Sequence, residues 1–213
     1  MHIAIMGGTF NPIHYGHLRI AEEAREYLVI DRLLFIPAFL PPHKEDGSLI
    51  APEDRLEMVK LAIKNNPYFE VSDTEIKRGG RSYSVDTLLS LHKEMPDAEI
   101  SFIVGTDSFN DITTWCEYER LFELTDFIVV TRHGYPVKKI GEILPEKVAR
   151  QFGYNAEKNR YIHAEGKTVT YLATTLLDVS ASDIRKRIKC GRSIKYLLPS
   201  DVERYIEGKR LYR

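Results

Sequence analysis

The sequence contains few cysteines and no long hydrophobic run. Its two cysteines, Cys116 and Cys190, lie far apart and form no C-x-x-C pair. This usage argues against a disulfide framework and suits a reducing cytosol, so we expect a cytoplasmic protein. No segment reaches the roughly 18 apolar residues that a membrane span needs. The N-terminus also lacks the basic and apolar regions of a signal peptide.

The sequence also lacks a charge excess of either sign. It carries 30 Lys and Arg against 31 Asp and Glu, a net charge of −1, so the overall charge does not indicate nucleic acid or a membrane as partner. Any anion site must therefore come from local placement. A length of 213 residues with 43% hydrophobic residues is typical of a soluble globular chain. We expect one domain over residues 1–213.

Short apolar runs alternate with helical patterns along the first two thirds of the chain. The predicted strands are 2–6, 33–36, 69–72, 100–104 and 127–131, and the predicted helices begin at 16, 52 and 84. Such βαβ alternation predicts an α/β fold with a Rossmann-like, doubly wound parallel sheet and helices on both faces. In these sheets ligands bind at the carboxyl ends of the strands, where the strand order reverses.

One glycine-rich stretch follows the first predicted strand directly. It reads GGTFNPIHYGH from Gly7 to His17, and it matches neither of the well-known phosphate-binding glycine patterns. Its glycines allow close backbone approach, and a helix beginning near Gly16 would direct N–H groups at an anion. His14 and His17 could donate hydrogen bonds to phosphate. The alternatives are a tight turn with incidental histidines, or a zinc pair for which no third ligand stands nearby.

This stretch resembles the signature of the nucleotidylyltransferase superfamily, and most closely that of the bacterial nicotinate-nucleotide adenylyltransferases. Asn11 stands where that family usually has Asp. The resemblance implies the nucleotidylyltransferase fold and adenylyl transfer from ATP to nicotinate mononucleotide in NAD biosynthesis, with pyrophosphate released and Mg²⁺ as cofactor. It assigns ATP binding to Gly7, Gly8, Thr9, Phe10 and His17, and catalysis to His14 and His17.

Two further motifs of the resemblance carry positive charge. Pro41-Pro42-His43-Lys44 follows the second predicted strand, and the family has the same P-P-H-K there. Lys44 would place a charge on the triphosphate, unless it is only a solvated loop lysine. VSASDIRKRI resembles the second signature, I-S-S-T-x-I-R, and so assigns ATP binding to Ser180 and a catalytic role to Arg185. Ser180 with Asp183, and Ser200 with Glu203, also predict helix caps.

A third group of residues would select the acceptor and hold the ribose. GRSYSVDTL resembles the family's S-Y-T-x-x-T-L, so Ser84 could bind the pyridine carboxylate, or it could simply cap a helix. In GTDSF, Gly105 and Asp107 follow a strand, where a carboxylate can accept hydrogen bonds from ribose hydroxyls; the plain alternative is a first-turn Asp. Further candidates for acceptor binding are Trp115, Cys116 in place of the family's Tyr, and Arg132.

The expected reaction is direct in-line attack by the acceptor phosphate, without a covalent enzyme intermediate. Other acceptors such as nicotinamide mononucleotide or phosphopantetheine, a cytidylyl donor, a non-catalytic nucleotide sensor and a metallohydrolase remain alternatives. We expect small-molecule partners only, apart from a possible homo-oligomer. The C-terminal helical part would cover about 180–213, and a segment over about 134–177 is a candidate insertion.

Overall fold

The computed structural model describes residues 1–41, 49–131 and 136–213, so Lys44 and Arg132 lie outside the described residues. The strands are β1 (His2–Gly8), β2 (Arg32–Pro37), β3 (Phe69–Val71), β4 (Glu99–Gly105), β5 (Asp126–Val130), β6 (Phe152–Asn155), β7 (Arg160–His163) and β8 (Thr168–Leu172). The helices are α1 (Tyr15–Leu28), α2 (Pro52–Ile63), α3 (Thr74–Arg78), α4 (Ser84–Glu94), α5 (Thr106–Asn110), η1 (Ile112–Thr114), α6 (Tyr118–Leu124), α7 (Ile140–Ile143), α8 (Glu146–Ala149), α9 (Ala181–Lys189) and α10 (Ser200–Lys209).

Within the described residues, the strands form one sheet in the order β3-β2-β1-β4-β5-β8-β7-β6. All pairs from β3 across to β8 are parallel, whereas β6 and β7 extend the sheet in antiparallel fashion. The strand order reverses between β1 and β4, because the chain first builds toward β3 and then returns to the other side of β1. The predicted doubly wound parallel sheet is thus confirmed, with an antiparallel edge added.

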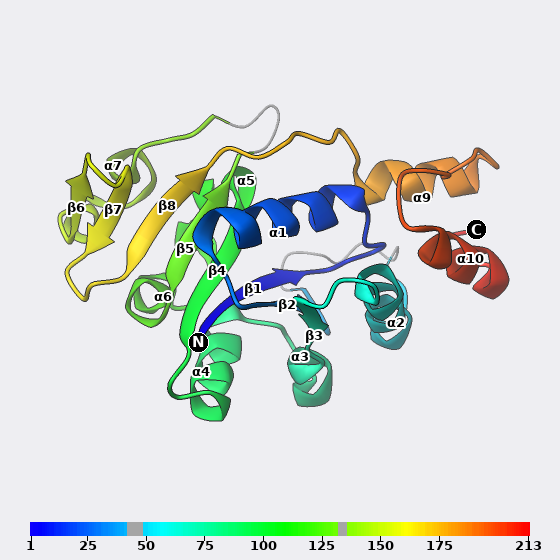
Figure 1. Cartoon of the computed structure of the whole chain (residues 1–213), viewed down its shortest axis with the longest axis horizontal. Coiled ribbons are helices and arrows are strands. Elements are labelled where there is room, and N and C mark those ends of the chain that lie inside the picture. Colours follow the sequence, from blue (N-terminus) through cyan, green and yellow to red (C-terminus); the bar gives the residue numbers. More distant parts are fainter. Residues whose placement is uncertain (42–48, 132–135) are drawn as a thin grey trace.

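The two faces of the sheet are covered by different helices (Figure 1). Along β1, Ala4 and Met6 pack into a core shared with α1, α2, α9 and α10. Ile3 and Ile5 alternate with them and pack into a second core shared with α4, α5, α6, α7 and α8. This period of two is the reason why a short strand can be apolar throughout and yet serve both cores.

The region after β5 differs most from the sequence expectation. The sequence EILPEKVARQFG (142–153) could form a single helix, but α7 ends at Ile143 and α8 begins at Glu146. Leu144 is extended (φ −97°, ψ 147°) because it precedes Pro145, which disfavours the helical region for its neighbour. Two further segments, RYIHA (160–164) and TVTYLA (168–173), have sequences that could form strands, and they form β7 and β8. In the described part of the chain, no helix is long and apolar enough to cross a membrane.

The C-terminal helices α9 and α10 lie at the end of the molecule opposite β6 and β7, next to α2 (Figure 1). Ser180 caps α9 as predicted, since its hydroxyl accepts a 3.1 Å hydrogen bond from the Asp183 N–H. The cap predicted at Ser200 is wrong, because Pro199 occupies the N-cap position and Ser200 is the first helical residue.

Candidate active site

A cleft of about 660 Å³ opens at the carboxyl ends of β1 and β4. This is where the strand order reverses, and therefore where the fold predicts a ligand. It brings together most of the residues that the sequence singled out. The predicted residues that line it are Gly7, Gly8, His14, His17, Ser84, Gly105, Asp107, Trp115 and Ser180.

Four predicted residues are described but do not line the cleft: Thr9, Phe10, Cys116 and Arg185. Cys116 is exposed. Phe10 is buried and packs edge-on against His17 at 5.2 Å between ring centroids, so its side chain belongs to the core. Only the backbone of Phe10, at φ 46°, remains as a possible contact for a nucleotide.

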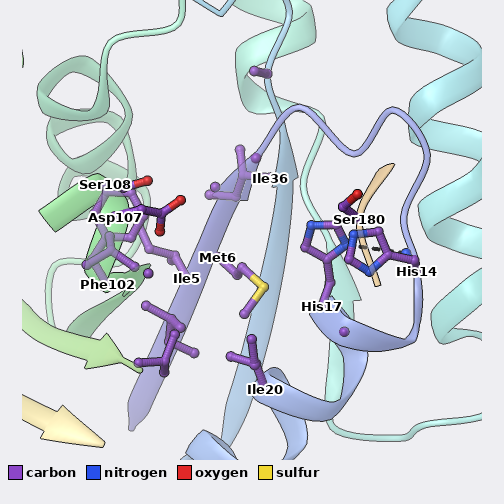
Figure 2. A pocket seen from close by; sticks show the side chains of 18 of the residues that line it. Ile5, Met6, His14, His17, Ile20, Ile36, Phe102, Asp107, Ser108 and Ser180 are labelled. Atoms are coloured by element: carbon purple, nitrogen blue, oxygen red, sulfur yellow. Dashed lines mark hydrogen bonds between the residues drawn. The ribbon is translucent and has the colours of Figure 1, made fainter. Parts of the chain in front are cut away.

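The two histidines lie together on one side of the cleft, close to Ser180 (Figure 2). Their ring centroids are 3.8 Å apart with an angle of 31° between the ring planes. The His14 N–H donates to Nδ1 of His17 at 3.3 Å. A neutral His17 ring that accepts at Nδ1 carries its proton on Nε2, which makes Nε2 a hydrogen-bond donor. Such a donor suits a phosphate oxygen.

Gly16 leaves room for the ring of His14. A Cβ at this position would lie 3.0 Å from both Cε1 and Nδ1 of that ring. Gly8 has the same relation to Phe10, whose ring carbons would lie 3.0–3.3 Å from an added Cβ. The glycines of the motif thus leave room for the motif's own aromatic rings, in addition to any ligand.

Arg55 does not line the cleft, but it supports the loops beside it and was not predicted from the sequence. Its side chain is fully buried, and its guanidinium donates to the carbonyl oxygens of Thr9 and Phe39, each at 2.9 Å. It thereby joins the loop after β1 to the loop after β2. Burial lowers the pKa of Arg55 below its ordinary value. Its burial could have been predicted from its position on the apolar face of α2, one turn before Met58 and Val59.

Arg185 contacts the glycine-rich loop from the C-terminal side. Its Nη1 donates to the carbonyl oxygen of Asn11 at 2.8 Å. The structure therefore brings the second signature motif to the first, although 174 residues separate the two partners. Arg185 supports the loop directly, whereas Ser180 in the same motif lines the cleft.

The other end of the cleft is built around α4. Ser84 is the first residue of this helix and Tyr83 is its N-cap, so Ser84 is not the cap residue. Nearby, the Thr87 hydroxyl donates to Oε1 of the buried Glu75 at 2.6 Å. Burial raises the pKa of Glu75, and hydrogen bonding from Thr87 opposes the shift. Both residues line the cleft, and neither was predicted as a site residue. Glu75 stands in no motif, whereas Thr87 matches the second threonine of the S-Y-T-x-x-T-L pattern.

Another part of the cleft is lined by Phe102, Asp107, Ser108 and Trp115. Phe102 and Trp115 lie 6.0 Å apart between ring centroids. Asp107 and Ser108 lie across β1 from the histidines (Figure 2). The cleft thus presents hydrogen-bond donors at one side and an aromatic and carboxylate wall at the other. That arrangement suits a ligand with phosphates and an aromatic ring.

A Rossmann-like sheet with such a loop at its switch point defines a nucleotide-binding α/β protein. The sequence pattern described as cytidylyltransferase-like matches residues 5–187. The chain is 52% identical over 212 residues to a protein of Citrifermentans bemidjiense named "Probable nicotinate-nucleotide adenylyltransferase", covering 100% of this chain and 98% of that protein. A protein of the same name from Geobacter sp. (strain M21) has the same identity and coverage.

A solved structure shares the fold. It is the nicotinic acid mononucleotide adenylyltransferase of Plasmodium falciparum complexed with NaAD, with a TM-score of 0.75 and 20% identity, covering 99% of this chain and 97% of that one. The chain belongs to the cytidylyltransferase-like nucleotidyltransferases, and within them to the nicotinate-nucleotide adenylyltransferase family.

Proposed function

We propose that the chain transfers the adenylyl group of ATP to nicotinate mononucleotide, giving deamido-NAD and pyrophosphate. The proposal rests on one observation: His14 and His17 line the same cleft as Ser84 and Trp115. One end offers donors for phosphates, and the other offers a hydroxyl and an aromatic ring for a pyridine. The names of relatives that align over the whole chain support the same reaction.

The chemistry needs no nucleophilic side chain. A phosphate oxygen of the acceptor attacks the α-phosphorus of ATP in line, and the bond from that phosphorus to the pyrophosphate oxygen breaks. Catalysis then consists of alignment and stabilisation of developing negative charge. His17 Nε2 and His14 would hold the transferring phosphates with the N–H groups of the loop. Lys44, outside the described residues, and Arg185 would neutralise the leaving pyrophosphate.

Mg²⁺ fits this site as an ion that arrives with the nucleotide. Among the described residues, no group of three or more His, Cys, Asp or Glu side chains could hold a metal ion. Mg²⁺ in nucleotide sites is usually held by phosphates, waters and one or two carboxylates. Bound in this way, the ion would supply positive charge to the phosphates.

Acceptor recognition would rest on Ser84, Trp115 and Arg132, with the backbone of Cys116 in place of the family's tyrosine. Asp107 and Gly105 would contact the ribose, and Ser180 a phosphate. The second candidate acceptor is nicotinamide mononucleotide, which differs from the first only in the amide. Glu75 in the cleft keeps this alternative open, because a carboxyl group can hydrogen-bond either an amide or a carboxylate, depending on its protonation.

His17→Ala tests the proposal. Losing one preorganised donor costs about 2.7–4 kcal/mol in the barrier, so turnover should fall roughly 10²- to 10³-fold. The assay is pyrophosphate release with ATP and each acceptor, beside a circular dichroism spectrum to verify folding. His92→Ala is the matched control, because His92 contacts the Leu124 carbonyl oxygen away from the cleft. Near-normal turnover in His17→Ala, or no release by the unsubstituted chain with either acceptor, would refute the assignment.

A further inference from the structure

The C-terminus of the chain contacts the glycine-rich loop through Tyr212. The Tyr212 hydroxyl donates to Oδ1 of Asn11 at 2.9 Å, across 201 residues of sequence. Both residues are buried, with 4% of Asn11 and 8% of Tyr212 exposed. The C-terminal region makes a second contact just after the loop. The backbone N–H of Tyr15, four residues after Asn11, donates to the Leu197 carbonyl oxygen at 3.1 Å.

Two guanidinium groups hold the same short segment. Arg55 donates to the carbonyl oxygen of Thr9 and Arg185 to that of Asn11. Carbonyl oxygens carry partial negative charge and repel phosphate. Because arginines donate hydrogen bonds to these two carbonyl oxygens, the loop presents fewer free acceptors to a phosphate ligand. Burial raises the pKa of Tyr212, with Arg185 and Arg55 opposing the shift, so the phenol remains a donor at neutral pH.

This segment has no regular structure of its own to fix its shape. Residues 9–14 belong to no helix or strand, and His14 stands at their end as the N-cap of α1. The buried side chains of Phe10 and Ile13 hold part of this segment, and the hydrogen bonds of Asn11 hold another part. The position of His14, and through their ring contact that of His17, therefore depends in part on Asn11. Small displacements of a catalytic group lower the reaction rate, because a misplacement of about 1 Å can reduce it about 10²-fold.

Resting on the proposed function, we propose that Tyr212 is a positioning residue for adenylyl transfer, acting through Asn11 on the loop that carries His14 and His17. It touches no reacting atom, and it does not line the cleft. Its effect on the reaction would come entirely from the hydrogen bond to Asn11. The C-terminal residues would then be part of the working site rather than only its support.

The test compares Tyr212→Phe with Tyr205→Phe. Both remove one hydroxyl from the C-terminal part, but Tyr205 donates to Oδ1 of Asp54 at 2.8 Å and does not touch the loop. With ATP and nicotinate mononucleotide, kcat for pyrophosphate release should fall about three- to tenfold in Tyr212→Phe, the range of one hydrogen bond. Tyr205→Phe should keep its kcat. Tyr212→Phe should lose more thermal stability than Tyr205→Phe, because it leaves the buried Oδ1 of Asn11 without its donor, whereas the Tyr205 bond is part-buried. Activity is therefore measured well below both melting temperatures, where each variant is folded, so that a kcat loss in Tyr212→Phe alone reports the position of the loop.

Substitutions of the acceptor give the second test. Asn11→Leu should lose kcat to a similar extent, and Tyr212→Phe should add little to it, because partners of one bond are not additive. Asn11→Asp keeps an acceptor oxygen and should retain most of the turnover. Equal kcat in Tyr212→Phe and the unsubstituted chain, or additive losses in the double variant, would overturn this proposal while leaving the proposed function intact. No turnover in the unsubstituted chain would instead refute the proposed function.

Discussion

Gly16→Ala should separate the stability of this protein from its activity. Gly16 lies in the first turn of α1, and it is not among the residues with positive φ. Alanine is therefore acceptable to the backbone, and replacing a helical glycine gains about 0.5–1 kcal/mol. The added Cβ would nevertheless stand 3.0 Å from two atoms of the His14 ring. That contact is tighter than almost all real ones, so the ring must move by a few tenths of an ångström.

The shift acts on the pair that the proposed reaction uses. His14 and His17 rings are 3.8 Å apart, so moving one disturbs the other. If a misplacement of about 1 Å costs about 10²-fold, a few tenths should cost roughly three- to tenfold in kcat. Pyrophosphate release measures the loss, and thermal unfolding should show a melting temperature close to that of the unsubstituted chain.

Gly208→Ala provides the matched control. Gly208 is exposed in α10, and an added Cβ would have no neighbour within 4 Å. The same gain in helix stability, roughly 1 kcal/mol, should raise the melting temperature of Gly208→Ala by about 2–4 °C at this chain length. Its turnover should not change. If Gly16→Ala kept full activity as well, the placement of the His14 ring could not be a requirement of the reaction.

Arg55→Met should cost about 3 kcal/mol in the free energy of unfolding, at about 1 kcal/mol for each of the three part-buried carbonyl oxygens, those of Thr9, Phe39 and Ile50, that lose their donor. Arg32→Met should cost less than about 1 kcal/mol in the same urea titration, because its ion pair with Glu70 is exposed; equal losses would contradict the role given to Arg55. Glu75→Gln tests the raised pKa of Glu75: a carboxyl whose folded pKa lies above its ordinary value of 4.5 contributes stability below that value and loses it as pH rises through the folded pKa. The variant's free energy of unfolding relative to the unsubstituted chain should therefore increase from pH 4.5 to pH 8, and a difference independent of pH would refute the shift.

The sequence predicted those features that depend on neighbours along the chain. The period of apolar residues located β1 to β5, and the spacing of His14 and His17 placed both histidines beside one loop. The cap at Ser180 was also predictable, since Ser180 and Asp183 are only three residues apart. In these cases the physical cause lies within one turn or one strand.

The missed features depend on contacts between distant segments. In the sequence, Arg55 is simply a charged residue on an amphipathic helix. Its contact with the loop after β1 cannot be predicted locally, because Thr9 lies 46 residues away in sequence. Tyr212 reads as a terminal residue until Asn11 meets it. Glu75 stands in no motif, and its burial comes from the packing of α3 against α4. Local patterns cannot predict such partners.

Asn11, in place of the family's Asp, acquires a physical meaning from these distant contacts. Its side chain is buried, its Oδ1 accepts from Tyr212, and its carbonyl oxygen accepts from Arg185. An amide supplies the same acceptor as a carboxylate without placing a negative charge beside that guanidinium. The asparagine therefore keeps an acceptor for the Tyr212 hydroxyl, as an aspartate would, while the loop carries one more unit of net positive charge than it would with Asp. That extra unit of charge favours a phosphate ligand beside the loop.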